Sequence, residues 1–286
     1  MHYVLLSVIC SVSVSVLIKY ARQKNINNLQ MFVWNYPCAI FLSYFLLSPH
    51  ISDISIHKLP VFLLLSLAFL LFALFIVIIH SIRTTGIAKT EVAQRLSLFI
   101  PLLAAYFIFG ERLGIEKISG VILGFMAIFL CLYQNKKAEV KSDESKILYP
   151  VIVFIGMGII DVLFKKIAQI DALPYSSLLF ILFVFAFFFA FLYLLYLLFI
   201  KRESLDKPAI AWGIAMGALN FGNILFYLKA HQYLPENPSI VFTAMNIGVI
   251  IVGALVGVFL FHEQLNKLNK IGILLAILSV IVIAYA

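Results

Sequence analysis

Charge is scarce in this sequence, and acidic charge is the scarcest. Only 12% of the 286 residues are charged, with 13 acidic residues against 21 Lys and Arg residues, while 64% are hydrophobic. A chain with so little polar surface cannot coat a soluble globule, whereas a protein surrounded by lipid has no such need. The mean hydropathy of +1.09 agrees with this interpretation. We therefore predict an integral, multi-pass protein of the cell (inner) membrane.

Alternation of polar and apolar residues is also missing from the long hydrophobic stretches. Strands of an outer-membrane barrel would alternate, but residues 61–79 and 178–200 are continuously apolar. Helices satisfy their own backbone hydrogen bonds within lipid, so continuous runs of this kind favour helices. The predicted fold class is an all-α integral membrane protein.

Motifs of catalytic and metal sites are absent from the sequence. It holds no G-x-S-x-G, H-E-x-x-H or P-loop pattern, and its six histidines are scattered without ligand spacing. Cys10, Cys38 and Cys131 lie inside apolar runs and are expected to be free thiols. We expect no enzyme, no metal and no cofactor. The net charge of +8 lies mostly on short loops, as orientation signals do, so no nucleic-acid partner is expected.

Ten apolar stretches each approach the roughly 20 residues that a helix needs to cross a bilayer. The first is expected to be a retained span, because no basic residue precedes it and no cleavage site follows it. A charged segment, 135–146, separates five predicted helices from five. The predicted spans are 3–21, 30–48, 60–83, 88–109, 114–134, 147–169, 175–200, 208–231, 238–261 and 267–285.

An offset of 152 residues relates the two halves of the chain. FGERLGIEKISGVILG at 109–124 superposes on FHEQLNKLNKIGILLA at 261–276, so that Glu111 falls on Glu263. Because five is odd, a duplicated five-helix unit enters the membrane from the opposite side the second time. We predict two inverted repeats, 1–134 and 147–286, joined by the charged linker 135–146, with Glu111 and Glu263 on opposite faces.

These features together resemble a known superfamily. The G-E-x-L hinge followed by a glycine, Pro101 in the fourth helix, and a lysine in the first helix of each half are similar to the drug/metabolite transporter superfamily, specifically EamA-type ten-helix permeases. The second half departs from the motif, with His262 in place of glycine and Gly253 in place of proline. The resemblance implies transport by alternating access around a central cavity between the repeats. G-x-x-x-G pairs, including Gly253 with Gly257, agree in letting helices approach closely.

Ionisable residues inside the predicted spans are the strongest functional pointers, because a charge in mid-bilayer normally faces a partner or a wet cavity. Glu91 and Arg95 are four residues apart on one helix, and so are Asp161 and Lys165 on another. The pairs either line the cavity as a coupling site, with Glu91 or Asp161 taking the proton, or neutralise each other near a membrane interface.

Polar residues within the spans supply a candidate substrate-binding set. Three of them follow a 3–4 spacing and form one helical stripe, which either orients a small polar solute or bonds neighbouring helices. Lys19 and Lys229 have no acid four residues away, so they either hold an anionic substrate or reach out to the interface. The candidate substrate-binding residues are Asn35, Tyr36, Gln94, Asn220, Asn223, Tyr227, Lys229 and Asn246.

The predicted function is a secondary active exporter of small metabolites, such as amino acids or related amphiphilic and anionic solutes. It is driven by protons or by exchange, and the protein is a monomer or homodimer in the lipid bilayer. The alternative is a non-transport membrane protein, such as a lipid-handling or assembly subunit. Fourteen of the 21 basic residues lie in the loops on one side of the membrane. Because basic loops are cytoplasmic, this count predicts that both termini lie outside, whereas the resemblance implies that both lie in the cytoplasm.

Overall fold

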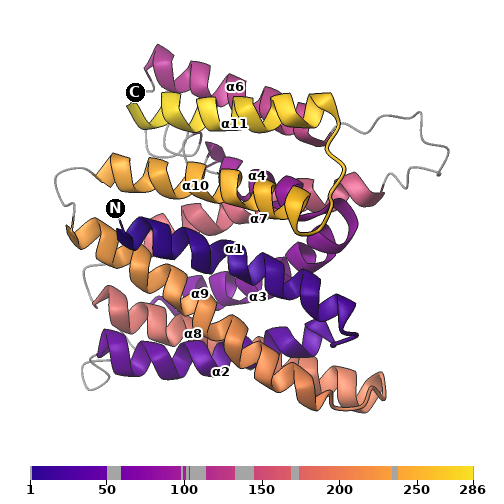
Figure 1. The fold of residues 1–286 in the computed structure, drawn as a ribbon. Coiled ribbons are helices and arrows are strands. Elements are labelled where there is room, and N and C mark those ends of the chain that lie inside the picture. Colours follow the sequence, from indigo (N-terminus) through magenta and orange to yellow (C-terminus); the bar gives the residue numbers. More distant parts are fainter. Residues whose placement is uncertain are drawn as a thin grey trace. The chain divides into compact units, whose positions relative to one another are not determined.

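The computed structural model is helical throughout its regular structure. It describes residues 2–49, 59–97, 99–100, 103, 114–132, 145–168, 174–233 and 238–285, and for a few of these only the backbone. Glu111, Pro101 and residues 135–144 of the predicted linker lie outside the described residues. In the described part the α-helices are α1 His2–Gln23, α2 Asn28–Leu47, α3 Val61–Thr85, α4 Ile87–Leu96, α6 Ile115–Leu132, α7 Ser145–Ala168, α8 Tyr175–Leu195, α9 Lys207–Tyr233, α10 Pro238–Phe259 and α11 Lys267–Tyr285 (Figure 1).

Six of the described helices are long and apolar enough to cross a membrane. They are α1, α2, α3, α7, α8 with the π-helical turn η3 Tyr196–Ile200 that continues it, and α9. Phe62, Phe199 and Phe259 expose more than 70% of their surface, as lipid-facing side chains do. Helix α4 is described for ten residues, and most of the predicted remainder of that span, 98–109, lies outside the described residues.

Asparagine side chains fix three helix ends. Asn27 Oδ1 accepts the backbone N–H of Leu29 and of Gln30 and so starts α2. At the start of α11, Asn266 Oδ1 accepts the N–H of Asn269, and Asn269 Oδ1 accepts the N–H of Asn266, which is a reciprocal cap. Asn269 Nδ2 also donates to the Cys131 carbonyl at 2.8 Å, which satisfies a free carbonyl at the end of α6.

The helices group into two compact units that cut across the sequence halves. Unit 1 comprises Met1–Val16, Val77–Ile159 and Asn223–Ala286, and unit 2 comprises Leu17–Ile76 and Ile160–Gly222. Helices α1, α3, α7 and α9 contribute residues to both units. Each unit therefore contains segments of both predicted repeats, and the repeat boundaries themselves stay a prediction.

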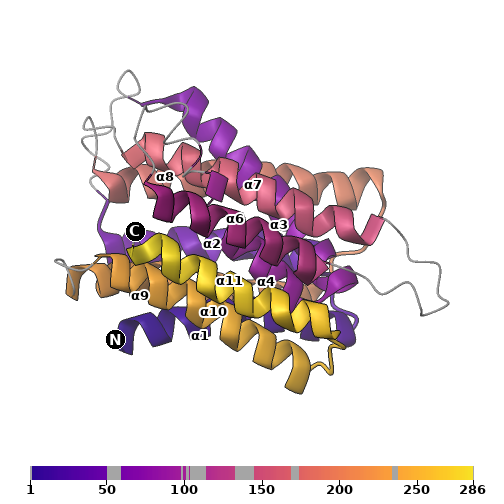
Figure 2. The ribbon, with the colours of Figure 1, turned by 90° about the horizontal axis from the view of Figure 1, so that it is seen from above.

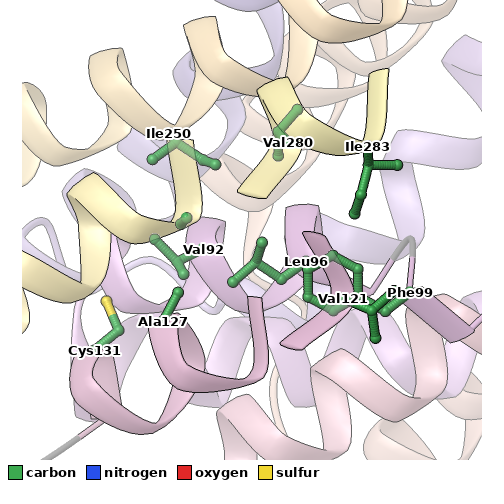
Figure 3. Packing of buried hydrophobic residues seen from close by; sticks show 10 residues of the cluster. Val92, Leu96, Phe99, Val121, Ala127, Cys131, Ile250, Val280 and Ile283 are labelled. Carbon is green, nitrogen blue, oxygen red and sulfur yellow. The ribbon is translucent and has the colours of Figure 1, made fainter. Parts of the chain in front are cut away.

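Unit 1 is built around the pairing of α6 with α11, which lie side by side in both views (Figures 1 and 2). Gly272 allows the contact, because an added Cβ would lie 2.6 Å from the Cys131 backbone nitrogen. Helix α10 packs against α11 and against α4. The buried cluster that joins these helices consists of Val92, Leu96, Phe99, Val121, Ala127, Cys131, Ile250, Ala276, Val280 and Ile283 (Figure 3).

Unit 2 holds α2 against α8, with an aromatic core and a glycine contact. The rings of Phe32 and Phe75 stack with centroids 4.2 Å apart. Gly213 and Gly217 of α9 face the backbone of α2, where a Cβ on Gly217 would collide with the Asn35 carbonyl. This G-x-x-x-G pair therefore permits the close helix approach that its spacing predicts.

Candidate functional site

Helix α4 buries a carboxylate beside an arginine. Seven of its ten residues are buried, and the side chain of Glu91 is 2% exposed. Arg95 Nη2 lies 3.9 Å from Glu91 Oε2, one helical turn away, and 20% of the Arg95 side chain is exposed. The structure thus brings the two side chains of this predicted pair together inside unit 1.

Three serines of α1, here called the serine seam, form hydrogen bonds with the charged pair and with one asparagine. Ser15 Oγ donates to Glu91 Oε1 at 2.6 Å, and Arg95 Nη2 donates to Ser11 Oγ at 2.8 Å. One further turn away, the Ser7 hydroxyl lies 2.7 Å from Asn223 Oδ1 of α9. The later serine meets the earlier α4 residue, so α1 and α4 run antiparallel along this contact.

Sequence reasoning missed the serine seam, although a signal was present. Ser7, Ser11 and Ser15 recur every four residues, which places them on one face of a helix. Serine inside a membrane helix is common and often bonds to its own backbone, so the spacing alone did not reveal a partner.

Glycines of α10 make room for carboxylates rather than for another backbone. A Cβ on Gly253 would lie 3.0 Å from Glu91 Cγ, and one on Gly257 would lie 2.6 Å from Glu263 Oε2. Helix α10 still packs closely against α4, as the spacing of this G-x-x-x-G pair predicts, and the two glutamate side chains fill the space beside the glycines. The glycines are needed because each glutamate side chain occupies the space beside α10.

Glu263 provides the N-terminal cap of α4. Its Oε1 accepts the Ile87 N–H at 2.7 Å and its Oε2 accepts the Ala88 N–H at 3.2 Å. The local N-cap residue, Gly86, has no side chain for this task and adopts φ 95°, which favours glycine. A carboxylate at a helix N-terminus also interacts favourably with the helix dipole. The hinge glutamate of the second half thus holds the helix that carries the charged pair of the first half.

The predicted polar stripe of α9 divides between two partners. Asn220 Nδ2 donates to Asn35 Oδ1 at 2.8 Å within unit 2, whereas Asn223 belongs to unit 1 and meets Ser7. Both contacts join neighbouring helices, which is what the alternative interpretation of the stripe expects. Tyr36 is 5% exposed and packs its ring against Phe32, with centroids 5.1 Å apart.

The remaining candidates occupy varied environments. Lys229 is exposed, which suits a lysine that reaches the membrane interface. Asp161 is half-buried, and the side chain of Lys165 lies outside the described residues, so the second predicted pair is untested. Gln94 is half-buried beside Arg95 in sequence, and Asn246 of α10 is 7% exposed. Among the described residues, no three His, Cys, Asp or Glu side chains converge as metal ligands would.

Comparison with protein families identifies the class. The EamA-like transporter family matches residues 1–133 and 145–285, which is nearly the whole chain in two repeats. The protein belongs to the EamA-like transporter family. This confirms the resemblance drawn from the G-E-x-L hinge, and membership indicates a membrane transporter of small solutes rather than an enzyme.

Two individual proteins are similar to this chain over nearly its whole length. An uncharacterised protein of Haemophilus influenzae (strain ATCC 51907 / DSM 11121 / KW20 / Rd) is 40% identical over 292 residues, covering 100% of this chain and 98% of the relative. A crystal structure of a protein superposes with a TM-score of 0.62 at 12% identity, covering 98% of this chain and 96% of that chain. The second likeness shows a shared fold.

The cap on α4 gives a direct stability test. Replacing Glu263 with Ala removes the acceptor for Ile87 and Ala88, and we expect a loss of about 0.5–2 kcal/mol, typical of a lost N-cap. Hydrogen exchange at those two amides should accelerate in the Glu263→Ala variant. The matched control is Gln264→Ala, an exposed side chain one residue away. Equal exchange at Ile87 and Ala88 in both variants would contradict the cap.

Proposed function

We propose that this EamA-family protein is a secondary active exporter of small anionic metabolites, of the amino-acid or organic-acid class, that works by alternating access. The observation that carries the proposal is the buried Glu91–Arg95 pair of α4, held by Ser15 and Ser11 of α1. A buried ion pair is costly to desolvate and is weak evidence for stability, so its presence in a membrane helix favours a functional role.

Arg95 has hydrogen-bonding capacity to spare. A guanidinium carries five N–H donors, and Arg95 places one nitrogen on Ser11 and stands 3.9 Å from Glu91, longer than a direct hydrogen bond. Its Nε is buried and has no hydrogen-bond partner. An unsatisfied buried donor calls for an acceptor, and a substrate carboxylate fits that need with two parallel oxygens.

Glu91 supplies a way to couple protons to the same arginine. A proton on Glu91 removes the negative charge beside Arg95, which leaves the guanidinium free to hold a substrate anion. The proton and the anion then bind together and move in the same direction, so net export occurs when the outward gradient of the solute exceeds the inward gradient of protons. Asp161, the second carboxylate of the predicted coupling set, is half-buried and takes a supporting part in this proposal.

The ten-span architecture with two inverted repeats is part of the same proposal. It is supported by the repeated hinge sequences and by the family match in two segments. In this scheme one repeat rocks against the other, which exposes the bound solute to either side of the membrane in turn.

The first functional prediction concerns substrate charge. Arg95→Gln should lower kcat/KM for anionic solutes by roughly ten- to a hundredfold, because a hydrogen bond to a charged group contributes about 1.5–3 kcal/mol. Arg95→Lys should keep part of the activity. The assay is efflux from vesicles of solutes first found by a metabolite-toxicity screen of cells with and without the gene.

The control for this experiment is Lys229→Gln, which removes an exposed cation from α9. It should leave the preference for anions in place. If Arg95→Gln lowers the efflux of anionic and cationic solutes equally, the proposed anion site is wrong. A loss confined to anions in Lys229→Gln would transfer the role to that lysine.

The second functional prediction concerns pH. Glu91→Gln keeps the hydrogen-bonding partner for Ser15 but mimics a permanently protonated side chain. The Glu91→Gln/Asp161→Asn double variant should still exchange solute across vesicle membranes, while an imposed pH gradient should no longer drive accumulation. Exchange and pH-driven uptake are measured on the same vesicles. If accumulation still follows the pH gradient in the double variant, the coupling assignment is wrong.

The third functional prediction concerns membrane topology. Single cysteines placed at 111 and 263, in a chain whose three native cysteines are replaced, should be labelled from opposite sides by a membrane-impermeant thiol reagent. Inverted repeats require this result because the two positions correspond under the offset of 152 residues. Labelling of both cysteines from the same side would exclude inverted repeats.

A further inference from the structure

An apolar groove runs between α10 and α11 on the surface of unit 1. It encloses about 270 Å³, and every residue that lines it is apolar except Lys270. Three of the lining side chains on α10 are largely open to the surroundings, with Ile251 40%, Leu255 50% and Phe259 73% exposed. The α10 residues that line it lie within the nine-residue stretch from Ile251 to Phe259, whose ends are about 12 Å apart along the helix.

The groove has a charged end. Lys267 and Lys270 lie in the first turn of α11, three residues apart and so on one face, and both are exposed. Helix α11 follows α10 after a short connection, so its first turn lies level with the end of α10 at Phe259. Lys270 lines the groove at this end, Lys267 lies one turn before it on the same face of α11, and the apolar walls lead away along both helices.

The charge at this end is of the wrong sign for the helix. Cations at a helix N-terminus oppose the helix dipole, and the first turn of α11 contains no acidic residue. The nearby carboxylate of Glu263 accepts hydrogen bonds from Ile87 and Ala88 of α4. Two lysines and a helix N-terminus thus form a concentration of positive charge that an anion would offset.

We propose that this groove binds an anionic phospholipid, with one acyl chain against Ile251, Leu255 and Ile273 and the phosphate between Lys267 and Lys270. The apolar walls match an acyl chain in chemistry. The position of the lysines at one end matches a headgroup at the membrane interface. The site is separate from the Glu91–Arg95 pair and does not depend on any transported solute.

Native mass spectrometry of the full-length protein tests the proposal. The protein is incubated with phosphatidylglycerol or phosphatidylcholine that carry the same acyl chains, and bound lipid is counted. Wild-type protein should retain phosphatidylglycerol preferentially. Lys267→Gln/Lys270→Gln should weaken that binding roughly ten- to thirtyfold, since each lysine near a lipid phosphate contributes a severalfold gain, and should leave phosphatidylcholine unchanged. Ala254→Phe, which fills the groove, should weaken the binding of both lipids.

The matched control is Lys207→Gln, which removes an exposed lysine from the first turn of another apolar helix, α9, where the surrounding side chains are polar. It should leave lipid retention at the wild-type level. Equal retention of the two lipids by wild-type protein, or unchanged phosphatidylglycerol binding in the double lysine variant, would overturn the proposal. A protein dimer that Ala254→Phe abolishes, observed in place of bound lipid, would also overturn it.

Discussion

The contact between α1 and α4 is the constraint on which the rest of unit 1 depends, because α4 carries a buried carboxylate that must be satisfied inside the protein. Glu91 receives the Ser15 hydroxyl, Arg95 reaches Ser11, and Gly253 of α10 leaves space for the Glu91 side chain. The two serines and Gly253 all lie outside α4. A short polar helix with this content is stable only where its neighbours supply hydrogen bonds at set positions, so the helices around α4 are fixed by it as much as it is fixed by them.

The two halves of the sequence are interdependent at this point. Glu263 and the glycines of α10 come from the second half, while α4, with Glu91 and the amides of Ile87 and Ala88, comes from the first. All of these residues belong to unit 1, which contains segments from both halves of the sequence. Glu263 of the second half thus holds the N-terminus of α4, and this helix carries the Glu91–Arg95 pair of the first half.

Local rules explain what the sequence made predictable. The bilayer sets a length for apolar runs, which is why the predicted boundaries of α2, α8 and α11 lie within a few residues of the observed ones. The Glu91–Arg95 spacing is a property of one helix. By contrast, the cap that Glu263 provides joins residues about 175 positions apart, and no periodicity encodes that pairing. The partners of the α9 stripe were not predictable in the same way, because Asn220 bonds to Asn35 of α2 and Asn223 bonds to Ser7 of α1, both far away in the sequence.

The most direct test of the central claim is a double-mutant cycle on unfolding free energy in detergent, with Ser15→Ala and Glu91→Ala as the two single changes, each of which removes the hydrogen bond. Because Ser15 Oγ and Glu91 Oε1 share a buried hydrogen bond of 2.6 Å, we expect a coupling energy of about 1–3 kcal/mol. Ser7→Ala combined with Glu91→Ala is the control, since Ser7 bonds to Asn223, and those two changes should be additive. A coupling between Ser15 and Glu91 no larger than this control would contradict the account.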